Sequence, residues 1–305
     1  MPKIKNIKLI ILSIIAVIIL FIATCIVSTI FWVKPNIEII FTINAGQGTR
    51  EIAANLQEKK AISSSFIFST LVYANHWYLQ DGVYKITPEQ NLISIAKMIH
   101  DGRVQEYVIT IPEGWRVTQI DNLLTQKKII QKGEFTKIAQ IKEGYLFPDT
   151  YRLALNATPQ EIMDLMLANF DKKTLGLNLK PQDIILASIV EREAKLDSDR
   201  SKIAGLYLNR LNIGMKLDAD PTIQYAKGSW APIAKSDYAN YQSPYNTYLH
   251  AGLPPTAICN PGLKSIEAVL NPDKNNYIYF FNNSDGSAVF SQTYEEHLTK
   301  LEHKK

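Results

Sequence analysis

Two glutamates in one strongly apolar segment are the residues best suited to acid–base chemistry. Glu191 and Glu193 follow the run Ile184-Ile185-Leu186-Ala187-Ser188-Ile189-Val190, and Pro181 lies ahead of it, where proline suits the first turn of a helix. The pattern predicts a buried helix over residues 181–194. At about 100° per residue, side chains two positions apart point to nearly opposite sides of a helix. The two carboxylates are therefore not expected to share a proton.

Glu191 is the first candidate for a general acid, and Glu193 is the second. The helical face of Glu191 carries small side chains, which leave room beside the carboxylate. Desolvation disfavours the charged form of a carboxyl group, and a glutamic acid in such a setting can donate a proton near neutral pH. The residues alone leave an alternative open: Glu191 pairs with a nearby arginine (Arg192, Arg200 or Arg210) and only stabilises the domain.

A second set of polar residues follows at Asp218-Ala219-Asp220-Pro221-Thr222. Two aspartates with no further acids beside them make a weak magnesium or calcium site, and an aspartate before proline is typical of a turn or cap. The five histidines are scattered, and no Cys/His cluster has zinc spacing. The sequence therefore predicts neither a metal site nor a cofactor.

A loop at Ser243-Pro244-Tyr245-Asn246-Thr247-Tyr248 interleaves aromatic and amide side chains. Aromatic rings stack on sugar rings, and amides hydrogen-bond to sugar substituents, so this composition suits carbohydrate recognition. The same composition is also common in loops that only support a fold. The residue types alone do not decide between these interpretations.

Composition and charge exclude several classes of protein. Of the 305 residues, 46% are hydrophobic and 20% are charged, which is typical of a folded chain. Four of the 33 lysine and arginine residues lie before residue 35 and none of the 29 acids do, which leaves 29 of each sign in residues 35–305. A neutral body without a basic block is a poor nucleic-acid binder, because phosphate contacts supply most of that affinity.

The N-terminal segment predicts a membrane anchor. Residues 9–33 carry no charge, and 25 residues at about 1.5 Å each span a hydrocarbon core of about 30 Å. Lys3, Lys5 and Lys8 precede the run, which predicts a cytoplasmic N-terminus and an exported body. The apolar stretch exceeds the ~7–15 residues of a signal-peptide core, so a retained anchor is favoured over a cleaved signal peptide.

The exported body shows strand and helix patterns in separate runs, which predict an α+β fold. Strands are expected over residues 37–43, 82–86 and 107–111, with helices after each, and a hairpin is expected to join residues 277–281 to 288–290. The first strand–helix pattern returns 66 residues later, from Gly48 to Gly114. Small repeated units of this kind either bind glycan or serve as scaffold.

Taken together, the segments resemble the MltG (YceG-like) family of membrane-anchored endolytic murein transglycosylases. The resemblance rests on these motifs in family order: Glu143-Gly144-Tyr145-Leu146-Phe147-Pro148-Asp149-Thr150-Tyr151, Ala187-Ser188-Ile189-Val190-Glu191-Arg192-Glu193, Asn209-Arg210-Leu211, Asp220-Pro221-Thr222, Tyr245-Asn246-Thr247-Tyr248, Gly252-Leu253-Pro254-Pro255 and Asn260-Pro261-Gly262. It implies a cytoplasmic tail at residues 1–8, a transmembrane helix at 9–33, a LysM-like α/β subdomain at 36–103, a second strand–helix unit with a boundary loop at 104–152, and an α+β catalytic domain at 153–305.

The resemblance also implies an activity. The family cleaves the β-1,4 bond between N-acetylmuramic acid and N-acetylglucosamine within nascent glycan strands, which ends their elongation. Its catalytic glutamate falls on Glu191, which would act first as acid and then as base while a 1,6-anhydro ring closes. The candidate cleft residues that the resemblance adds are Asp220, Thr222, Tyr245, Asn246 and Tyr248.

Two other functions compete with this interpretation. The chain could be a non-catalytic peptidoglycan-binding module anchored in the membrane, or a hydrolase that uses water and releases reducing ends. Expected binding partners are the glycan strands, the cytoplasmic membrane and, by location, the peptidoglycan synthases. No nucleic acid is expected.

Overall fold

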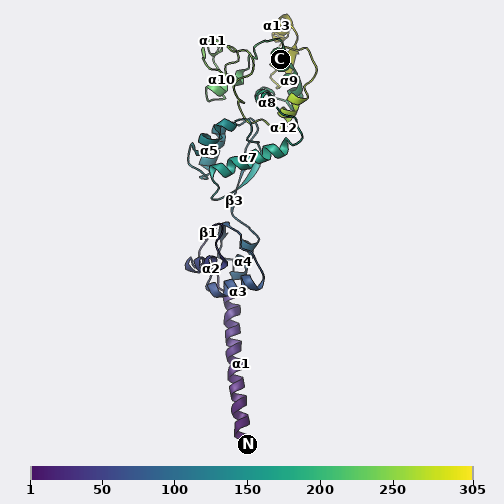
Figure 1. Cartoon of the computed structure of the whole chain (residues 1–305). Helices are drawn as coiled ribbons and strands as arrows, with labels where there is room; N and C mark the ends of the chain where they lie inside the picture. Colours follow the sequence, from purple (N-terminus) through teal and green to yellow (C-terminus); the bar gives the residue numbers. More distant parts are fainter. Residues whose placement is uncertain (1, 304–305) are drawn as a thin grey trace. The chain divides into compact units, whose positions relative to one another are not determined.

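The computed structural model describes residues 2–303, with side chains from residue 11 onwards, and Figure 1 traces its elements. The chain divides into two compact units. One contains the residues up to Tyr107 together with Arg152–Asn156, and the other contains Val108–Tyr151 and the residues from Ala157 on. Met1 and the side chains of the predicted tail, including its lysines, lie outside this description.

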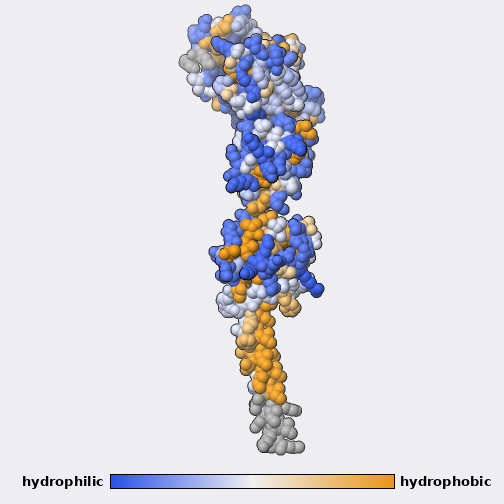
Figure 2. Space-filling model, turned by 90° about the vertical axis from the view of Figure 1, so that its left-hand side faces the viewer, coloured by the Kyte–Doolittle hydropathy of each residue, from blue (hydrophilic) through white to orange (hydrophobic). Residues whose placement is uncertain are grey.

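Helix α1 (Pro2–Phe31) opens the first unit. Its segment Ile11–Phe31 is long and apolar enough to cross a membrane, and none of it is buried inside the protein. No residue of this segment is charged on any side of the helix, and Figure 2 shows apolar side chains along the face turned to the viewer. A helix with apolar residues on all sides needs an apolar environment on all sides, which a bilayer supplies.

The rest of the first unit is a small α+β layer. Strands β1 (Ile39–Ile43) and β2 (Gly82–Ile86) pair antiparallel with Phe41 opposite Tyr84. Three helices cover one side of this sheet: α2 (Thr49–Glu58), α3 (Ser65–Ala74) and α4 (Leu92–His100). The alternating burial of β1 turns Ile39, Phe41 and Ile43 into the core, where they meet the apolar faces of the helices.

Strands β3 (Glu106–Thr110) and β4 (Thr150–Ala154) form a second two-stranded sheet, and the division between the units falls within both strands. The Ile111 amide donates to the Asp149 carbonyl oxygen (2.9 Å) just beyond this ladder. Residues 144–151, expected as a loop at a domain boundary, thus lead into a strand at Thr150.

The second unit contains mostly short helices and one hairpin. Its helices are α5 (Val117–Gln126), α6 (Glu134–Ala139), α7 (Pro159–Lys173), α8 (Pro181–Glu193), α9 (Arg200–Asn212), α10 (Asp220–Ala226), α11 (Asp237–Asn240), α12 (Leu263–Leu270) and α13 (Tyr294–Glu302). Single 3₁₀ turns lie at Gln140–Lys142 and Asp197–Asp199. Strands β5 (Tyr279–Asn282) and β6 (Ala288–Ser291) pair antiparallel.

Helix α8 is the centre of this unit. Pro181 lies in its first turn, and the Asp183 carboxylate accepts the Lys180 amide (2.8 Å), which satisfies one of the free donors at the helix start. The helix packs against α9, α10 and α12. Its middle is fully buried, and this burial fixes the direction in which the side chains of its last turn point.

The predicted α+β class is confirmed: the described residues form helices and three two-stranded sheets. The strands expected over residues 37–43, 82–86 and 107–111 are present with shifts of two residues at most, and the predicted hairpin is present. Elements that the sequence patterns did not predict are β4, α6, α10, α11, α12 and α13. Two of these, α10 and α12, hold residues of the candidate site.

Candidate active site

Glu191 lies in the last turn of α8 with 6% of its side chain exposed; one carboxylate oxygen forms an ion pair and the other accepts two hydrogen bonds. Oε1 faces the Arg200 guanidinium at 3.2 Å. Oε2 accepts the Gly262 amide at 3.0 Å and the Ser265 hydroxyl at 2.8 Å. Arg200 also donates to Ser265 (2.5 Å) and to Asp197 (3.0 Å), so the cation is held from two further sides.

The three donors to Glu191 come from two helices that pack on α8. Arg200 is the first residue of α9, while Gly262 and Ser265 belong to the first turn of α12. Amides at a helix start have no partner within the helix and carry partial positive charge. The start of α12 therefore supplies donors where the end of α8 presents a carboxylate.

Glu113 is a second carboxyl group beside this cluster, and sequence analysis did not single it out. It packs closely over Gly262: a Cβ atom at that position would lie 1.9 Å from Glu113 Oε1. Burial raises the pKa of Glu113, and the charge of Glu191 raises it further. The only available signal was its place before Gly114, 78 residues ahead of Glu191 along the chain.

Glu193 lies in a different cluster from Glu191. The Tyr207 hydroxyl donates to its Oε1 at 3.1 Å, and the two glutamates share no hydrogen-bond partner. Burial raises the pKa of Glu193 to about 7, and the charge of Asp220 adds to this rise. Asp220 in turn accepts the Tyr248 hydroxyl at 2.5 Å.

The structure separates the five candidate cleft residues into different settings. Asp220 and Tyr248 lie together near Glu193. Thr222 and Asn246 are fully buried: the Thr222 hydroxyl donates to the Ala219 carbonyl, and the Asn246 amide holds the backbone of its own loop. The Thr222 bond therefore stabilises the start of α10, and the Asn246 bonds stabilise its own loop. Tyr245 lines a cavity.

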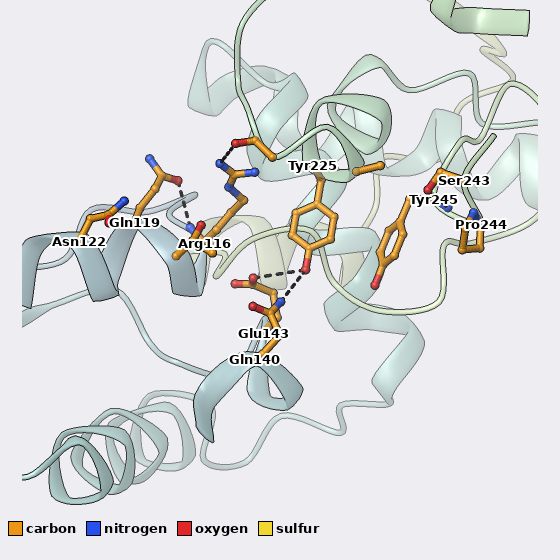
Figure 3. A pocket seen from close by; sticks show the side chains of 12 residues that line it. Arg116, Gln119, Asn122, Gln140, Glu143, Tyr225, Ser243, Pro244 and Tyr245 are labelled. Atoms are coloured by element: carbon orange, nitrogen blue, oxygen red, sulfur yellow. Dashed lines mark hydrogen bonds between the residues drawn. The ribbon is translucent and has the colours of Figure 1, made fainter. Parts of the chain in front are cut away.

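That cavity is about 620 Å³ and lies between the α5 segment and the loops after α10 (Figure 3). Tyr225 and Tyr245 lie side by side on one wall, with ring centroids 4.9 Å apart, and Glu143 and Gln140 meet the Tyr225 hydroxyl. Its lining residues are Arg116, Thr118, Gln119, Asn122, Gln140, Glu143, Tyr225, Ala226, Gly228, Ser243, Pro244 and Tyr245. Rings, amides and one buried cation line the space.

The cavity and the Glu191 cluster flank one short segment. Glu113 covers the amide that binds Glu191, and Arg116, three residues later, lines the cavity. Three residues of extended chain span at most about 11 Å. Asn260 holds this segment by pairing with Trp115 through its backbone and its side-chain amide. The two sites are therefore neighbouring parts of one region.

Glu143 gives the region a measurable pH dependence. Burial raises its pKa from 4.5 to about 7, so the folded state binds this proton more tightly than the unfolded chain does. The stabilisation is present at low pH and is lost as pH rises from about 4.5 through 7. We expect Glu143→Gln to raise the free energy of unfolding at pH 8 by about 2–3 kcal/mol and to change it little at pH 4.

Urea unfolding at both pH values checks this expectation. The glutamine oxygen keeps the bonds from the Val117 amide and Asn260, and its amide group faces the Tyr225 hydroxyl. Glu161→Gln, at an exposed helix start, is the control for removing a carboxylate outside this region. An equal loss of stability for Glu143→Gln at both pH values contradicts the assignment.

No three or more metal-ligating side chains come together in the part of the chain whose side chains the structure describes. Neither cysteine forms a disulfide: Cys25 is exposed on α1, and Cys259 is buried with its thiol donating to the Ser188 carbonyl (3.3 Å). The chemistry that this region offers is proton transfer by carboxyl groups beside arginine, tyrosine and amide groups.

A comparison with family models decides the relationship of the chain. The model of the YceG-like family matches residues 41–303, which include the first unit from residue 41 onwards and the whole region around Glu191. The chain belongs to the YceG-like family. The match covers well over half of the sequence and includes every residue of the Glu191 cluster.

Relatives of this YceG-like chain carry one name, "Endolytic murein transglycosylase". The relative from Bacillus subtilis (strain 168) is 32% identical over 295 residues, covering 84% of this chain and 81% of the relative. The relative from Streptococcus pneumoniae serotype 2 is 28% identical over 310 residues, and the match spans 56% of its length. A crystal structure of a yceG-like protein from Listeria monocytogenes is 31% identical, with a TM-score of 0.58, and covers 87% of this chain and 99% of that one.

Proposed function

We propose that the chain is an endolytic murein transglycosylase. The observation that carries the proposal is the setting of Glu191 at the end of a buried helix, where Arg200, Ser265 and the Gly262 amide stabilise its charged form, the form that must accept the second proton. The names of the relatives support the same activity. Asp220, Thr222, Tyr245, Asn246 and Tyr248 remain the proposed cleft residues.

Glu191 carries both proton transfers of the proposed reaction. Its carboxyl proton passes to the glycosidic oxygen as the bond from C1 of the muramoyl residue to O4 of the glucosaminyl residue breaks. The resulting carboxylate takes the proton of the muramoyl 6-hydroxyl as O6 bonds to C1, and Arg200 offsets its charge between the steps. Because the nucleophile is an internal hydroxyl, the reaction needs no second carboxylate to activate water.

The masses of the products test this reaction. The full-length chain in detergent is incubated with purified glycan strands, and we expect internal fragments that end in 1,6-anhydromuramic acid. Fragments heavier by one water would identify a hydrolase instead. Strands that are retained on the protein but stay intact, while a control enzyme digests them, would favour the binding-module alternative.

The proposed site of action is the outer face of the cytoplasmic membrane. The apolar helix α1 supports a single-pass anchor, and the lysines before it support a cytoplasmic N-terminus. Protease treatment of intact spheroplasts tests the orientation. Digestion of the body from outside agrees with it, and full protection contradicts it.

We further propose that residues 36–103 act as a LysM-like subdomain and that residues 153–305 form the catalytic domain. The strand–helix segment at residues 104–152 then completes the active site, since Arg116 and Glu143 line the 620 Å³ cavity. A chain without residues 36–103 should bind strands more weakly but keep the bond specificity. Unchanged affinity would remove the LysM-like assignment.

Peptidoglycan synthases are the proposed protein partners, because an enzyme of new strands in this membrane works where those strands are made. Co-purification after cross-linking tests the idea against an unrelated single-pass membrane protein. Recovery no higher than that control would end it.

A further inference from the structure

Two arginines share one tryptophan ring beside the Glu191 cluster. The Arg192 guanidinium carbon lies 4.1 Å from the centroid of Trp230, and that of Arg116 lies 4.8 Å from it. The Trp230 indole donates to Gln119 Oε1 (2.8 Å), which holds the ring beside both cations. We call these three residues the Arg–Trp–Arg stack.

The cations of this stack lack anionic partners. Among the described side chains, neither Arg116 nor Arg192 forms an ion pair, and the Nε atom of each is buried without a hydrogen-bond partner. Arg116 is 8% exposed and donates only to the Gly228 carbonyl (2.8 Å). Buried charges are almost always paired, because leaving water is costly for an ion.

Neighbouring groups compensate these charges only in part. Glu143 interacts with Arg116 electrostatically without pairing with it, and burial raises the pKa of this carboxyl to about 7. The ring face of Trp230 attracts both cations, but it accepts no hydrogen bond in the plane of a guanidinium. Donors therefore remain free for an anionic ligand.

The position of the stack limits which anion that is. Arg192 follows Glu191 directly, and a Cβ atom on Gly114 would lie 3.1 Å from Arg192 Nη1 and 3.5 Å from Glu191 Cγ. The stack thus lies beside the carboxylate that would cleave the bond, and Arg116 extends it to the 620 Å³ cavity. The anion must belong to the sugar at the scissile bond or to its substituent.

Peptidoglycan offers one such anion. The muramoyl residue that supplies C1 and O6 also carries the stem peptide, whose side chains and end hold free carboxylates. An endolytic enzyme acts within strands, far from any charged group at a strand end. We propose that the Arg–Trp–Arg stack binds a stem-peptide carboxylate of the muramoyl residue whose bond is cleaved. The inference rests on the proposed function.

Kinetics on three matched substrates test the proposal. The substrates are strands with intact stems, strands whose stems have been removed by an amidase, and strands whose stem carboxylates have been amidated. We expect the full-length protein to cleave the first about tenfold or more faster, by kcat/KM, than the other two. Hydrogen bonds to charged groups contribute about 1.5–3 kcal/mol, which is about ten- to a hundredfold in kcat/KM.

Arg192→Gln should lose about tenfold or more in kcat/KM on stem-bearing strands, while its kcat/KM on denuded strands should stay within about threefold of that of the unaltered protein. Arg192→Lys keeps the charge without the planar fork, so its kcat/KM on stem-bearing strands should lie between those of the unaltered protein and Arg192→Gln. Arg152→Gln removes an exposed arginine of β4 that pairs with Glu106, and it should change nothing. Equal losses on all three substrates would show that Arg192 acts on Glu191 or on the fold, and would overturn the proposal.

A binding measurement separates this proposal from the proposed function. In a Glu191→Gln background no strand is cut, and the dissociation constants of the three substrates should follow the same order. Loss of that order with Arg192→Gln supports the carboxylate site, whereas equal constants for stem-bearing and denuded strands refute it. If the unaltered protein cleaves nothing, the proposed function fails, but the binding order still decides whether the stack holds a carboxylate.

Discussion

Glu191→Gln is expected to abolish strand cleavage, while Glu193→Gln is expected to leave it largely intact. Proton transfer by a positioned side chain contributes about 10²–10⁴-fold in rate, so the first variant should lose at least a hundredfold in kcat. Glutamine keeps an oxygen for the Gly262 amide and Ser265. The loss of activity in Glu191→Gln is therefore due to the missing proton transfer and to the missing charge beside Arg200.

Glu193→Gln is the matched control for this experiment. The same substitution two residues away, on the same helix, keeps an acceptor for the Tyr207 hydroxyl and removes a carboxyl whose pKa burial raises to about 7. Its turnover should stay within about tenfold of the unaltered protein, a smaller loss than general acid–base catalysis accounts for. Circular dichroism and urea midpoints show whether both variants fold. A folded Glu193→Gln without turnover, beside an active Glu191→Gln, would reverse the assignment.

The second large effect concerns stability, at a buried amide that joins three segments of the second unit. Asn260 is fully buried, and its Oδ1 accepts the amides of Gly144 (2.9 Å) and Leu146 (3.0 Å). Its Nδ2 donates to the Trp115 carbonyl (3.0 Å) and to Glu143 (3.1 Å). These four bonds use the full hydrogen-bonding capacity of the side chain, two acceptor lone pairs and two N–H donors.

Asn260→Ala should therefore lower the free energy of unfolding by at least about 3 kcal/mol. Each buried polar group left without a hydrogen-bond partner costs about 1–3 kcal/mol, and the substitution removes the partner of several such groups at once. Urea unfolding measures the change. Asn271→Ala, which removes an exposed amide that bonds within α12, is the control and should stay within about 0.5 kcal/mol. A change below about 1 kcal/mol for Asn260→Ala would show that water or backbone shifts replace its bonds.

Long periodic segments of this chain were predictable because their signal is local. The apolar run of α1, the alternation of β1 and the buried body of α8 each depend on neighbours within one element. The separation of Glu191 from Glu193 follows from helical geometry alone. The sequence therefore placed the carboxylates on the correct element and on different sides of it.

The hydrogen-bond partners of Glu191 could not be predicted from the sequence, because these contacts are not local. Gly262 and Ser265 lie more than 70 positions away in the chain and approach only because α12 packs on α8. Helices α10 and α12 have 7 and 8 residues, which is about two turns, too few for a clear periodicity. The composition of residues 260–262 is that of a turn, and only the structure shows that Gly262 is the N-cap of α12.

Residue type alone does not show which polar side chains are buried. Thr222 and Asn246, which the family resemblance places among the cleft residues, are both fully buried with hydrogen-bond partners in their own loop or beside it. Arg116 and Trp230 show the reverse: no local pattern marks them, and their importance comes from a shared contact. A single sequence does not encode exposure at isolated polar positions.

The buried thiol of Cys259 has a use outside glycan chemistry. Its side chain is fully buried, and this burial raises the pKa of the thiol well above its ordinary value. An alkylating reagent can modify Cys259 only when the surrounding core opens, so its labelling rate, distinguished from that of the exposed Cys25 by peptide mass, reports the free energy of that opening. Because Cys259 adjoins Asn260 in the chain, this intrinsic reporter senses loosening at the junction of the three segments without any engineered probe.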